Sequence, residues 1–444
     1  MSLPYHRVSD EVFRALATGG GGAEAVRELA ATQYSKHLLL LRGVLDEATA
    51  TDTGQADMTR AGYALLTAVQ RHDPVAADAV IRHPSVGGWS LRAVRAMRGD
   101  RALPAAEPAR LCSVAAAAAI RARFPADIEV PATGGTVMLP SLGAAAVDSD
   151  TATVRCAPGT GGADVLSSGR HVHLPADPHQ DAPGWTALRR LRAGPVEVLI
   201  DDLDPCRMPA TTNVAPRLDA GEARMWDSAF QDVWSLLRRH HPATAAEAEA
   251  AIRVLVPLAA PPHGQASSSS AENFGAVALS SPGGPRDFAL TLTHEVQHLK
   301  LAALLAVVPL TEPGDGRRFY APWREDPRPI GSLLQGAYAF LGVSGFWRRQ
   351  RSLDQGPEGL HAHMEFARWR MAASRAADTL FSSELLTAEG QEFVRGMAGT
   401  LRSWQDEPVP AEAQAWARHE AAQHLARWQS AHGPVPAWSP RGDV

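Results

Sequence analysis

The 444-residue sequence predicts an α+β protein that is mainly α-helical. Long segments toward both ends carry apolar residues at helical spacing, which is typical of helices with one buried face. A shorter middle segment has β-branched runs separated by Gly, Asp and Pro, which is typical of strands and turns. We therefore expect an N-terminal helical region at residues 1–125, a small β-rich unit at 126–205, and a third region at 206–444.

The overall charge and composition exclude several classes of function. A net charge of −5 gives no basic surface for nucleic acid or for anionic lipid. No run approaches the roughly 20 apolar residues that a membrane-spanning helix needs. The N-terminus lacks a charged-then-apolar leader, and the three widely spaced cysteines, Cys112, Cys156 and Cys206, are expected to be free thiols. These features predict a cytoplasmic protein, and they do not indicate its oligomeric state.

Within the first two regions, Pro, Gly and Asp-Pro signals mark the ends of the expected helices and strands. Helices are expected from Asp10 and at 23–47, 57–71, 74–82, 89–98 and 107–123. The glycines at 19–22 lack the Lys-Ser/Thr of a phosphate loop, so they predict a flexible turn. Strands are expected at 128–130, 136–139, 151–154, 171–174 and 196–200.

Two groups in the β-rich unit have metal-ligating side chains. His171 and His173 alternate on one face of a strand, and we interpret them as solvent-facing, with a metal or proton site as the alternative. The acids of 201–204 follow the last strand. They could bind a hard cation, but a capping turn paired with Arg207 is the preferred interpretation.

A ten-residue stretch at 291–300 has the strongest chemical signal. His294 and His298 are four residues apart, so both imidazoles lie on one face of a helix and can bind one metal ion. Glu295 follows the first histidine, about 100° round the helix, beside the open side of the metal. Flanking leucines and Phe288 predict a buried helix, Asp287 is a candidate cap, and Pro309 ends it. A satisfied histidine pair on a structural helix is the alternative.

The segments around this helix bear on the kind of metal site. Residues 218–256 predict two helices, and 274–280 predict a strand directly before the motif. In metal-dependent peptidases with this motif, a strand at that place presents an edge to an extended peptide. The third region is therefore expected to be similar to the zincin-like fold, with a short edge strand.

The third metal ligand is left open by the residues themselves. The next predicted helix, at 329–350, has no His, Asp or Glu, and Gln335 stands where a zinc peptidase would have a carboxylate, with Tyr338 one turn on. Glu365 on the following helix is the rival third ligand. With the two histidines it would form the two-His, one-carboxylate set of non-haem Fe(II) oxygenases. A salt bridge from Glu365 to a nearby arginine is the alternative.

The loop at 319–329 contains two arginines that could bind a carboxylate. Arg324 or Arg328 could hold an organic acid, because a guanidinium matches a carboxylate bidentately. The alternative is that Arg324 pairs with Asp326 and stiffens the loop. Lys300 lies on the far side of the metal helix, and we expect it to reach outward.

The combined motifs resemble those of the HExxH-motif peptide-modification proteins, also described as 2-oxoglutarate-dependent HExxH-type peptide β-hydroxylases. The resemblance rests on HEVQHLKL (294–301), APWREDPRP (321–329) and LLQGAYAF (333–340), with DDLDP (201–205) and ARWR (367–370). It extends from Tyr5 to about Trp404. It implies Fe(II) and 2-oxoglutarate as cofactors and a ribosomally made precursor peptide as the partner.

On this resemblance, His294 and His298 hold the iron, while Glu295 is a ligand, a base or a substrate anchor. Tyr338 is a further catalytic candidate. Two other functions remain open. A zinc endopeptidase or leader peptidase would use Zn²⁺ with Glu295 as general base. A non-catalytic module would bind the precursor peptide without modifying it.

Overall fold

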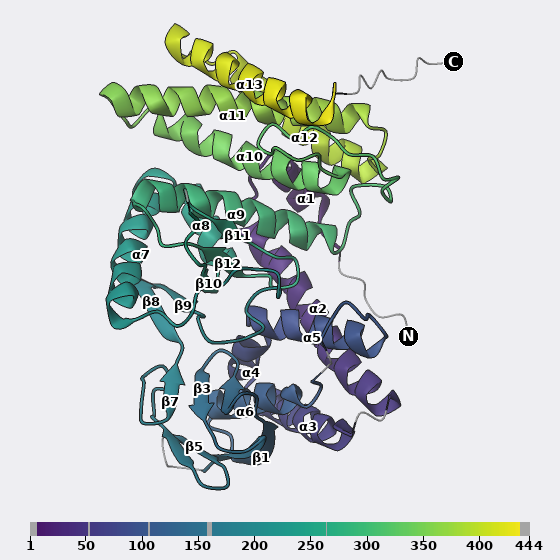
Figure 1. Cartoon of the computed structure of the whole chain (residues 1–444), viewed down its shortest axis with the longest axis vertical. Helices are drawn as coiled ribbons and strands as arrows, with labels where there is room; N and C mark the ends of the chain where they lie inside the picture. The colour runs from purple at the N-terminus through teal and green to yellow at the C-terminus, as the bar shows by residue number, and fades with distance from the viewer. Residues whose placement is uncertain (1–6, 52–53, 105–106, 158–161, 263, 436–444) are drawn as a thin grey trace. The chain divides into compact units, whose positions relative to one another are not determined.

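A computed structural model describes residues 7–51, 54–104, 107–157, 162–262 and 264–435 (Figure 1). The chain divides into two compact units, and each is described by itself. Unit 1 comprises residues 1–32, 232–251 and 283–444, and unit 2 comprises 33–231 and 252–282. Helices α2 (Gly22–Ala50) and α7 (Ala220–His240) contain residues of both units. None of the described helices is long and apolar enough to cross a lipid bilayer.

Unit 1 is helical in its described part. Besides parts of α2 and α7, its helices are α1 (Asp10–Ala17), α8 (Pro242–Ala251), α9 (Pro285–Leu305), α10 (Ile330–Gln350), α11 (Gly356–Ser382), α12 (Ala388–Gln405) and α13 (Ala411–His432). Helix α10 packs against both α9 and α11, and α11 also packs against α12 and α13. Figure 1 shows α10, α11 and α13 lying side by side. The predicted helices at 291–300 and 329–350 are confirmed as α9 and α10.

Helix α9 carries the predicted histidine motif. Its N-cap is Gly284 and its first residue is Pro285, whose ring suits a first helical position. The prediction that Asp287 caps the helix was therefore wrong by one turn. Asp287 lies in the first turn, where its negative charge interacts favourably with the helix dipole.

Unit 2 is built around a buried, alanine-rich helix, α6 (Arg110–Ala122). Its residues from Leu111 to Ala119 are all buried. Small side chains let neighbouring helices approach α6 closely. A Cβ at Gly62 of α3 (Ala56–His72) would lie only 2.7 Å from the backbone nitrogen of Cys112, so this approach requires glycine. Helices α4 (Pro74–Ile81) and α5 (Pro84–Met97) complete the helical part.

Two antiparallel sheets pack with these helices in one hydrophobic core. One has the order β1 (Ala126–Pro131), β4 (Thr151–Cys156), β5 (Ala163–Leu166), β6 (His171–Leu174). The other has the order β2 (Thr136–Leu139), β3 (Gly143–Ala146), β7 (Trp185–Ala187). Because helices and sheets share this core, the compact units follow different boundaries from the three predicted regions.

The third sheet of unit 2 differs from the prediction in two places. Its order is β11 (Ser267–Ser268), β12 (Ala276–Leu279), β10 (Val254–Pro257), β9 (Val196–Ile200), β8 (Arg189–Ala193), and β9, β10 and β12 are mutually parallel. Residues 254–256, predicted as the end of a helix, lie in the strand 254–257, in which every residue is buried. Such a short apolar run does not distinguish helix from strand by periodicity. Strand β12 is an inner strand, so the predicted edge strand before the metal helix was wrong.

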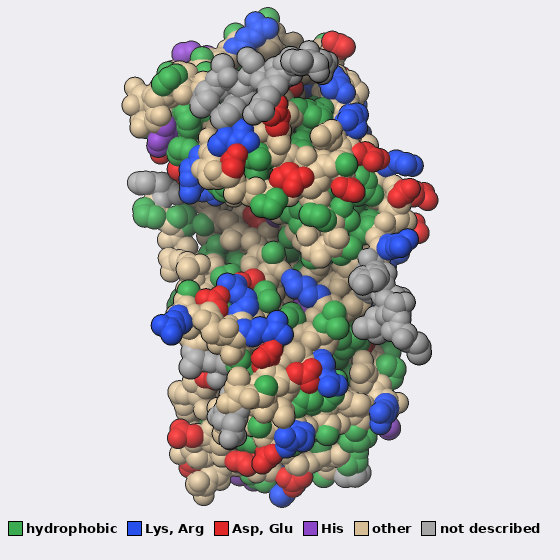
Figure 2. All heavy atoms as spheres, turned by 90° about the vertical axis from the view of Figure 1, so that its right-hand side faces the viewer, with side chains coloured by type: hydrophobic (Ala, Val, Ile, Leu, Met, Phe, Trp, Pro, Cys, Tyr) green, Lys and Arg blue, Asp and Glu red, His purple; other side chains and the backbone are tan. Residues whose placement is uncertain are grey.

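The surface charge agrees with the composition. On the face drawn in Figure 2, basic and acidic side chains are interspersed, as expected for a net charge of −5. All three cysteines are free, as predicted, and Cys112 and Cys156 are buried.

Candidate metal centre

The two histidines of α9 point their rings at a common position. Nε2 of His294 lies 3.1 Å from Nε2 of His298, and the ring centroids are 4.7 Å apart. Two nitrogens that each bind one metal at about 2.1 Å, at neighbouring positions, lie roughly 3 Å apart. The two nitrogens are therefore close enough to act as two ligands of one ion.

Gln335 of α10 holds the second histidine from the opposite side of its ring. Its Oε1 lies 3.1 Å from Nδ1 of His298. An amide oxygen only accepts, so Nδ1 donates and the lone pair of Nε2 is left for a metal. The prediction that Gln335 is itself a ligand does not fit this conformation, because its oxygen contacts the nitrogen that points away from His294.

The protonation of His294 also suits metal binding. Burial, and secondarily the charge of His298, lower the pKa of His294 from 6.5 to about 4. Glu295, only 2% exposed, acts in the opposite direction through its negative charge. Imidazole binds metals in its neutral form, which His294 keeps at physiological pH.

The structure does not bring the predicted carboxylate to this pair. Oε2 of Glu365 accepts a 2.6 Å hydrogen bond from Nε1 of Trp369, and Oε1 lies 3.8 Å from the Arg368 guanidinium. Among the described residues, no three His, Cys, Asp or Glu side chains converge to hold a metal. The predicted set of His294, His298 and Glu365 is thus not assembled, because neighbours one turn away on α11 satisfy the carboxylate.

A row of stacked aromatic rings lies beside His294. Phe340 packs against the imidazole with ring centroids 5.3 Å apart. Trp323 stacks on Phe340 at 4.7 Å and Trp369 stacks on it at 4.3 Å. Gly336 permits this, because a Cβ there would be 2.5 Å from the Trp323 ring. The sequence analysis did not predict this row of rings. Its one signal in the sequence was that Gly336 and Phe340 are four residues apart, one helical turn, and follow the loop that contains Trp323.

Two predictions on the far side of α9 were wrong. Tyr338, predicted as catalytic, is fully buried and its hydroxyl donates a 2.8 Å hydrogen bond to the Leu16 carbonyl. Its ring faces Lys300, whose Nζ lies 5.7 Å from the ring centroid. Lys300, predicted to reach outward, is 1% exposed, and its Nζ lies 2.8 Å from Oε2 of Glu247. Both side chains stabilise the fold.

The two arginines of the loop at 319–329 share one carboxylate. Arg324 lies 3.1 Å from Asp326, and Arg328 lies 2.7 Å from it. These contacts, led by the Arg328 hydrogen bond, lower the pKa of Asp326. Backbone hydrogen bonds between Phe319 and Arg328 close the loop. This is the predicted alternative, in which the arginines stiffen the loop, and an organic acid would have to displace Asp326.

The histidines of the β-rich segment are solvent-facing, as preferred in the sequence interpretation. His171 and His173 are more than 60% exposed, and both contact Oδ1 of Asp164.

The acids after β9 are buried in a capped turn. Asp201 accepts from the backbone nitrogen of Asp204, whose carboxylate pairs with Arg110 at 2.7 Å. Arg207 donates to the backbone carbonyl of Asp204. The capping turn is confirmed, but the arginine that pairs with the Asp204 carboxylate is Arg110, 94 residues away. Sequence spacing gives no signal for such a partner.

Comparison with known proteins adds no family assignment. No family model matches the chain, and a search of curated proteins gives no significant match. The resemblance to the HExxH peptide-modification proteins therefore rests on the sequence motifs alone.

Proposed function

We propose that this protein is an Fe(II)- and 2-oxoglutarate-dependent hydroxylase of a ribosomally made precursor peptide, acting at a β-carbon. The observation that carries the metal-dependent part is the 3.1 Å approach of the two Nε2 atoms, with Nδ1 of His298 bonded to Gln335. The identity of the metal, the keto acid and the peptide comes from the resemblance of the motifs. Because the proposed substrate is made on ribosomes, we infer that the reaction takes place in the cytoplasm.

The residues of unit 1 have distinct roles in this proposal. His294 and His298 would hold the iron, and Gln335 positions the His298 ring. Trp323 and Phe340 form an apolar wall beside His294 that limits the access of water. When bound, iron supplies the redox chemistry by which 2-oxoglutarate, O₂ and a peptide C–H group give succinate, CO₂ and a C–OH group.

A zinc endopeptidase is the second candidate. The observation that favours it is Glu295, a buried carboxylate adjacent to His294 on the metal helix, where a general base would be required. Against it, β12 is an inner strand and α10 has no acidic residue. The hydroxylase therefore fits better.

The test uses the full chain with a precursor peptide encoded beside its gene, and it measures peptide mass. With Fe(II), 2-oxoglutarate, ascorbate and O₂, we expect a gain of one oxygen atom and an equal amount of succinate. His294→Ala should abolish both, whereas the exposed control His419→Ala on α13 should leave both unchanged.

Other outcomes would select another function. Cleavage of the peptide with Zn²⁺, lost in Glu295→Gln, would establish the endopeptidase. Tight peptide binding without any change in mass under either condition would establish the non-catalytic module.

A further inference from the structure

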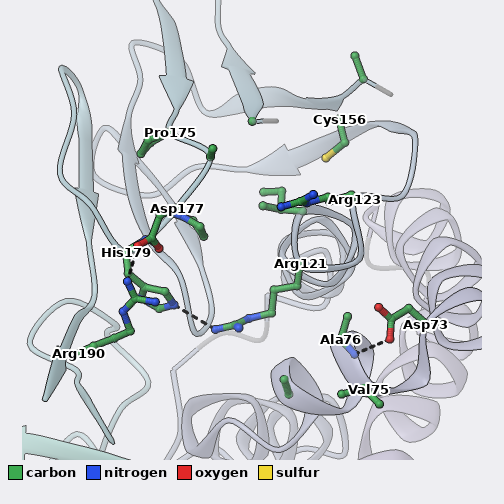
Figure 3. Close-up of a pocket in the computed structure, with 16 residues that line it drawn as sticks. Asp73, Val75, Ala76, Arg121, Arg123, Cys156, Pro175, Asp177, His179 and Arg190 are labelled. Carbon is green, nitrogen blue, oxygen red and sulfur yellow. Dashed lines mark hydrogen bonds and ion pairs between the residues drawn. The ribbon is translucent and has the colours of Figure 1, made fainter. Parts of the chain in front are cut away.

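Unit 2 contains a cavity of about 690 Å³ that sequence reasoning did not find (Figure 3). Its walls come from the start of α4, the end of α6, the ends of β4 and β6, and β8. Several lining side chains are apolar, including Val75, Ala79 and Ile120. Three arginines also line it, namely Arg121, Arg123 and Arg190.

Arg121 is fixed in place by neutral groups. Its Nη2 lies 3.3 Å from Nε2 of His179 and 3.1 Å from the Ser141 carbonyl oxygen. Nδ1 of His179 lies 2.9 Å from the Leu188 carbonyl oxygen, so Nδ1 is the donor and Nε2 accepts from Arg121. Burial lowers the pKa of His179, which keeps the ring neutral. The groups that hydrogen-bond Arg121 are thus neutral, although the more distant charge of Glu197 also acts on it.

The acidic side chains of the cavity are already engaged. Asp177 pairs with Arg190 and accepts from the His179 backbone nitrogen. Asp73 caps α4 by accepting from the Ala76 nitrogen at 3.0 Å. Within the described ranges, neither Arg121 nor Arg123 has a carboxylate within ion-pair distance.

The backbone directs the second arginine into the cavity. Arg123 is the C-cap of α6 and has a left-handed conformation, with φ of 49°. This conformation is uncommon for a residue with a side chain. Figure 3 shows Arg121 and Arg123 extending from the end of α6 into the space between the helices and the strands.

We propose that this cavity is a second binding site, which takes a carboxylate group carried on a partly apolar ligand. Arg121 and Arg123 would contact the carboxylate, and Val75, Ala79 and Ile120 would contact the apolar part. The described lining residues include three arginines and two aspartates, so their net charge is +1 with His179 neutral. That charge favours an anion, and the apolar lining favours a carboxylate on a hydrocarbon chain over inorganic phosphate, which has no apolar part. The proposal does not depend on the metal centre.

The carboxylate could belong to an acidic peptide or to a small organic acid, and the experiment distinguishes these sources. The probe is a rhodamine-labelled (Ala-Glu)₅ peptide, followed by fluorescence anisotropy, with (Ala-Gln)₅ as the uncharged control. Succinate and inorganic phosphate serve as competitors. Arg123→Gln and Arg121→Gln are tested against Arg42→Gln, an exposed arginine that pairs with Asp46 on α2 outside the cavity.

We expect the wild-type protein to bind the acidic peptide, and Arg123→Gln to weaken this binding by about tenfold or more. Arg42→Gln should bind like the wild type. Succinate binding that depends on Arg123, without peptide binding, would identify a small acid as the ligand and support the site equally.

Three results would overturn the proposal. The first is that the wild type binds neither the peptide nor succinate. The second is that binding survives when Arg121 and Arg123 are both replaced. The third is that phosphate competes better than succinate. Arg123 is exposed, so its variant should fold even if replacing Arg121 disturbs the core.

Discussion

Oε1 of Gln335 lies 3.1 Å from Nδ1 of His298, while Nε2 of the same ring faces His294. A side chain on α10 therefore determines which nitrogen on α9 is available to a metal.

This relationship predicts the effect of removing the amide. Gln335→Leu should weaken metal affinity by about 10- to 100-fold, because the His298 ring would lose the acceptor that fixes its orientation. Competition with a chromophoric chelator measures the dissociation constant. Gln423→Leu, which removes a similar contact to the exposed His419, is the control and should have no effect. An unchanged affinity in Gln335→Leu would mean that the ring needs no such support.

The close approach of Trp323 to Gly336 predicts a second effect. Gly336→Ala would place a methyl group 2.5 Å from the indole, so the ring must move away from Phe340. We expect overpacking to lower the unfolding free energy by about 1–3 kcal/mol in urea denaturation. Gly331→Ala in the same helix meets no atom within 4 Å, so it should be neutral or slightly stabilising. Equal behaviour of the two variants would contradict a tightly packed aromatic row.

The buried pair of Lys300 and Glu247 predicts a strongly coupled double-mutant cycle. Lys300→Met leaves the Glu247 carboxylate buried without its cation, which should cost about 3–5 kcal/mol of unfolding free energy. Adding Glu247→Gln should recover part of this loss. Arg14→Met removes exposed pairs with Asp10 and Glu392 and should change stability by less than about 1 kcal/mol. Additive effects of the two buried substitutions would show that the charges do not interact.

His37 predicts a loss of stability in mild acid. It is buried, and burial lowers its pKa from 6.5 to about 4, despite the hydrogen bond to the Ile81 carbonyl. Between these pH values the unfolded chain binds the proton and the folded chain does not, so the unfolding free energy falls as the pH falls. The contribution of His37 is about 3 kcal/mol over that range.

Urea denaturation from pH 7 to pH 4 measures the slope of the unfolding free energy against pH. His37→Gln should reduce the slope, because glutamine binds no proton in that range. Val86→Ala is the control, since it removes buried apolar contacts and should lower stability equally at every pH. Parallel curves for the wild type and His37→Gln would exclude His37 as a source of acid sensitivity.

Local patterns predicted much of the structure correctly. The helical spacing and proline signals located α9 and α10 closely, and β2, β6 and β9 have the predicted bounds. Periodicity and breakers act over a few residues, which is why they suffice for single elements. They fail for a short apolar run such as 254–257, which became a strand because parallel neighbours cover it on both sides.

The candidate site was predicted only in part, for the same reason. His294 and His298 lie on one helix, so their spacing fixed their geometry. Glu365, Gln335 and Tyr338 lie on other helices, where rotation and packing decide the direction of each side chain. Lys300 was placed correctly on the far face of α9, but its partner Glu247 lies 53 residues earlier and has no local signal.

The face of α9 opposite the histidines is hydrogen-bonded to backbone carbonyl oxygens of the turn that follows α1. Nζ of Lys300 donates to the carbonyls of Gly19 and Gly20, and Gln297 also donates to Gly19. A carbonyl cannot be removed by exchanging a side chain, so a point substitution at Gly20, where a Cβ would have room, would spare the contacts. Gly19 differs, because it has a φ of 87° and a Cβ there would lie 2.8 Å from Leu341. Inserting or deleting one residue there would instead shift the oxygens out of register. The length of this short segment, together with the glycine at position 19, should therefore govern how well the histidine helix is held in place.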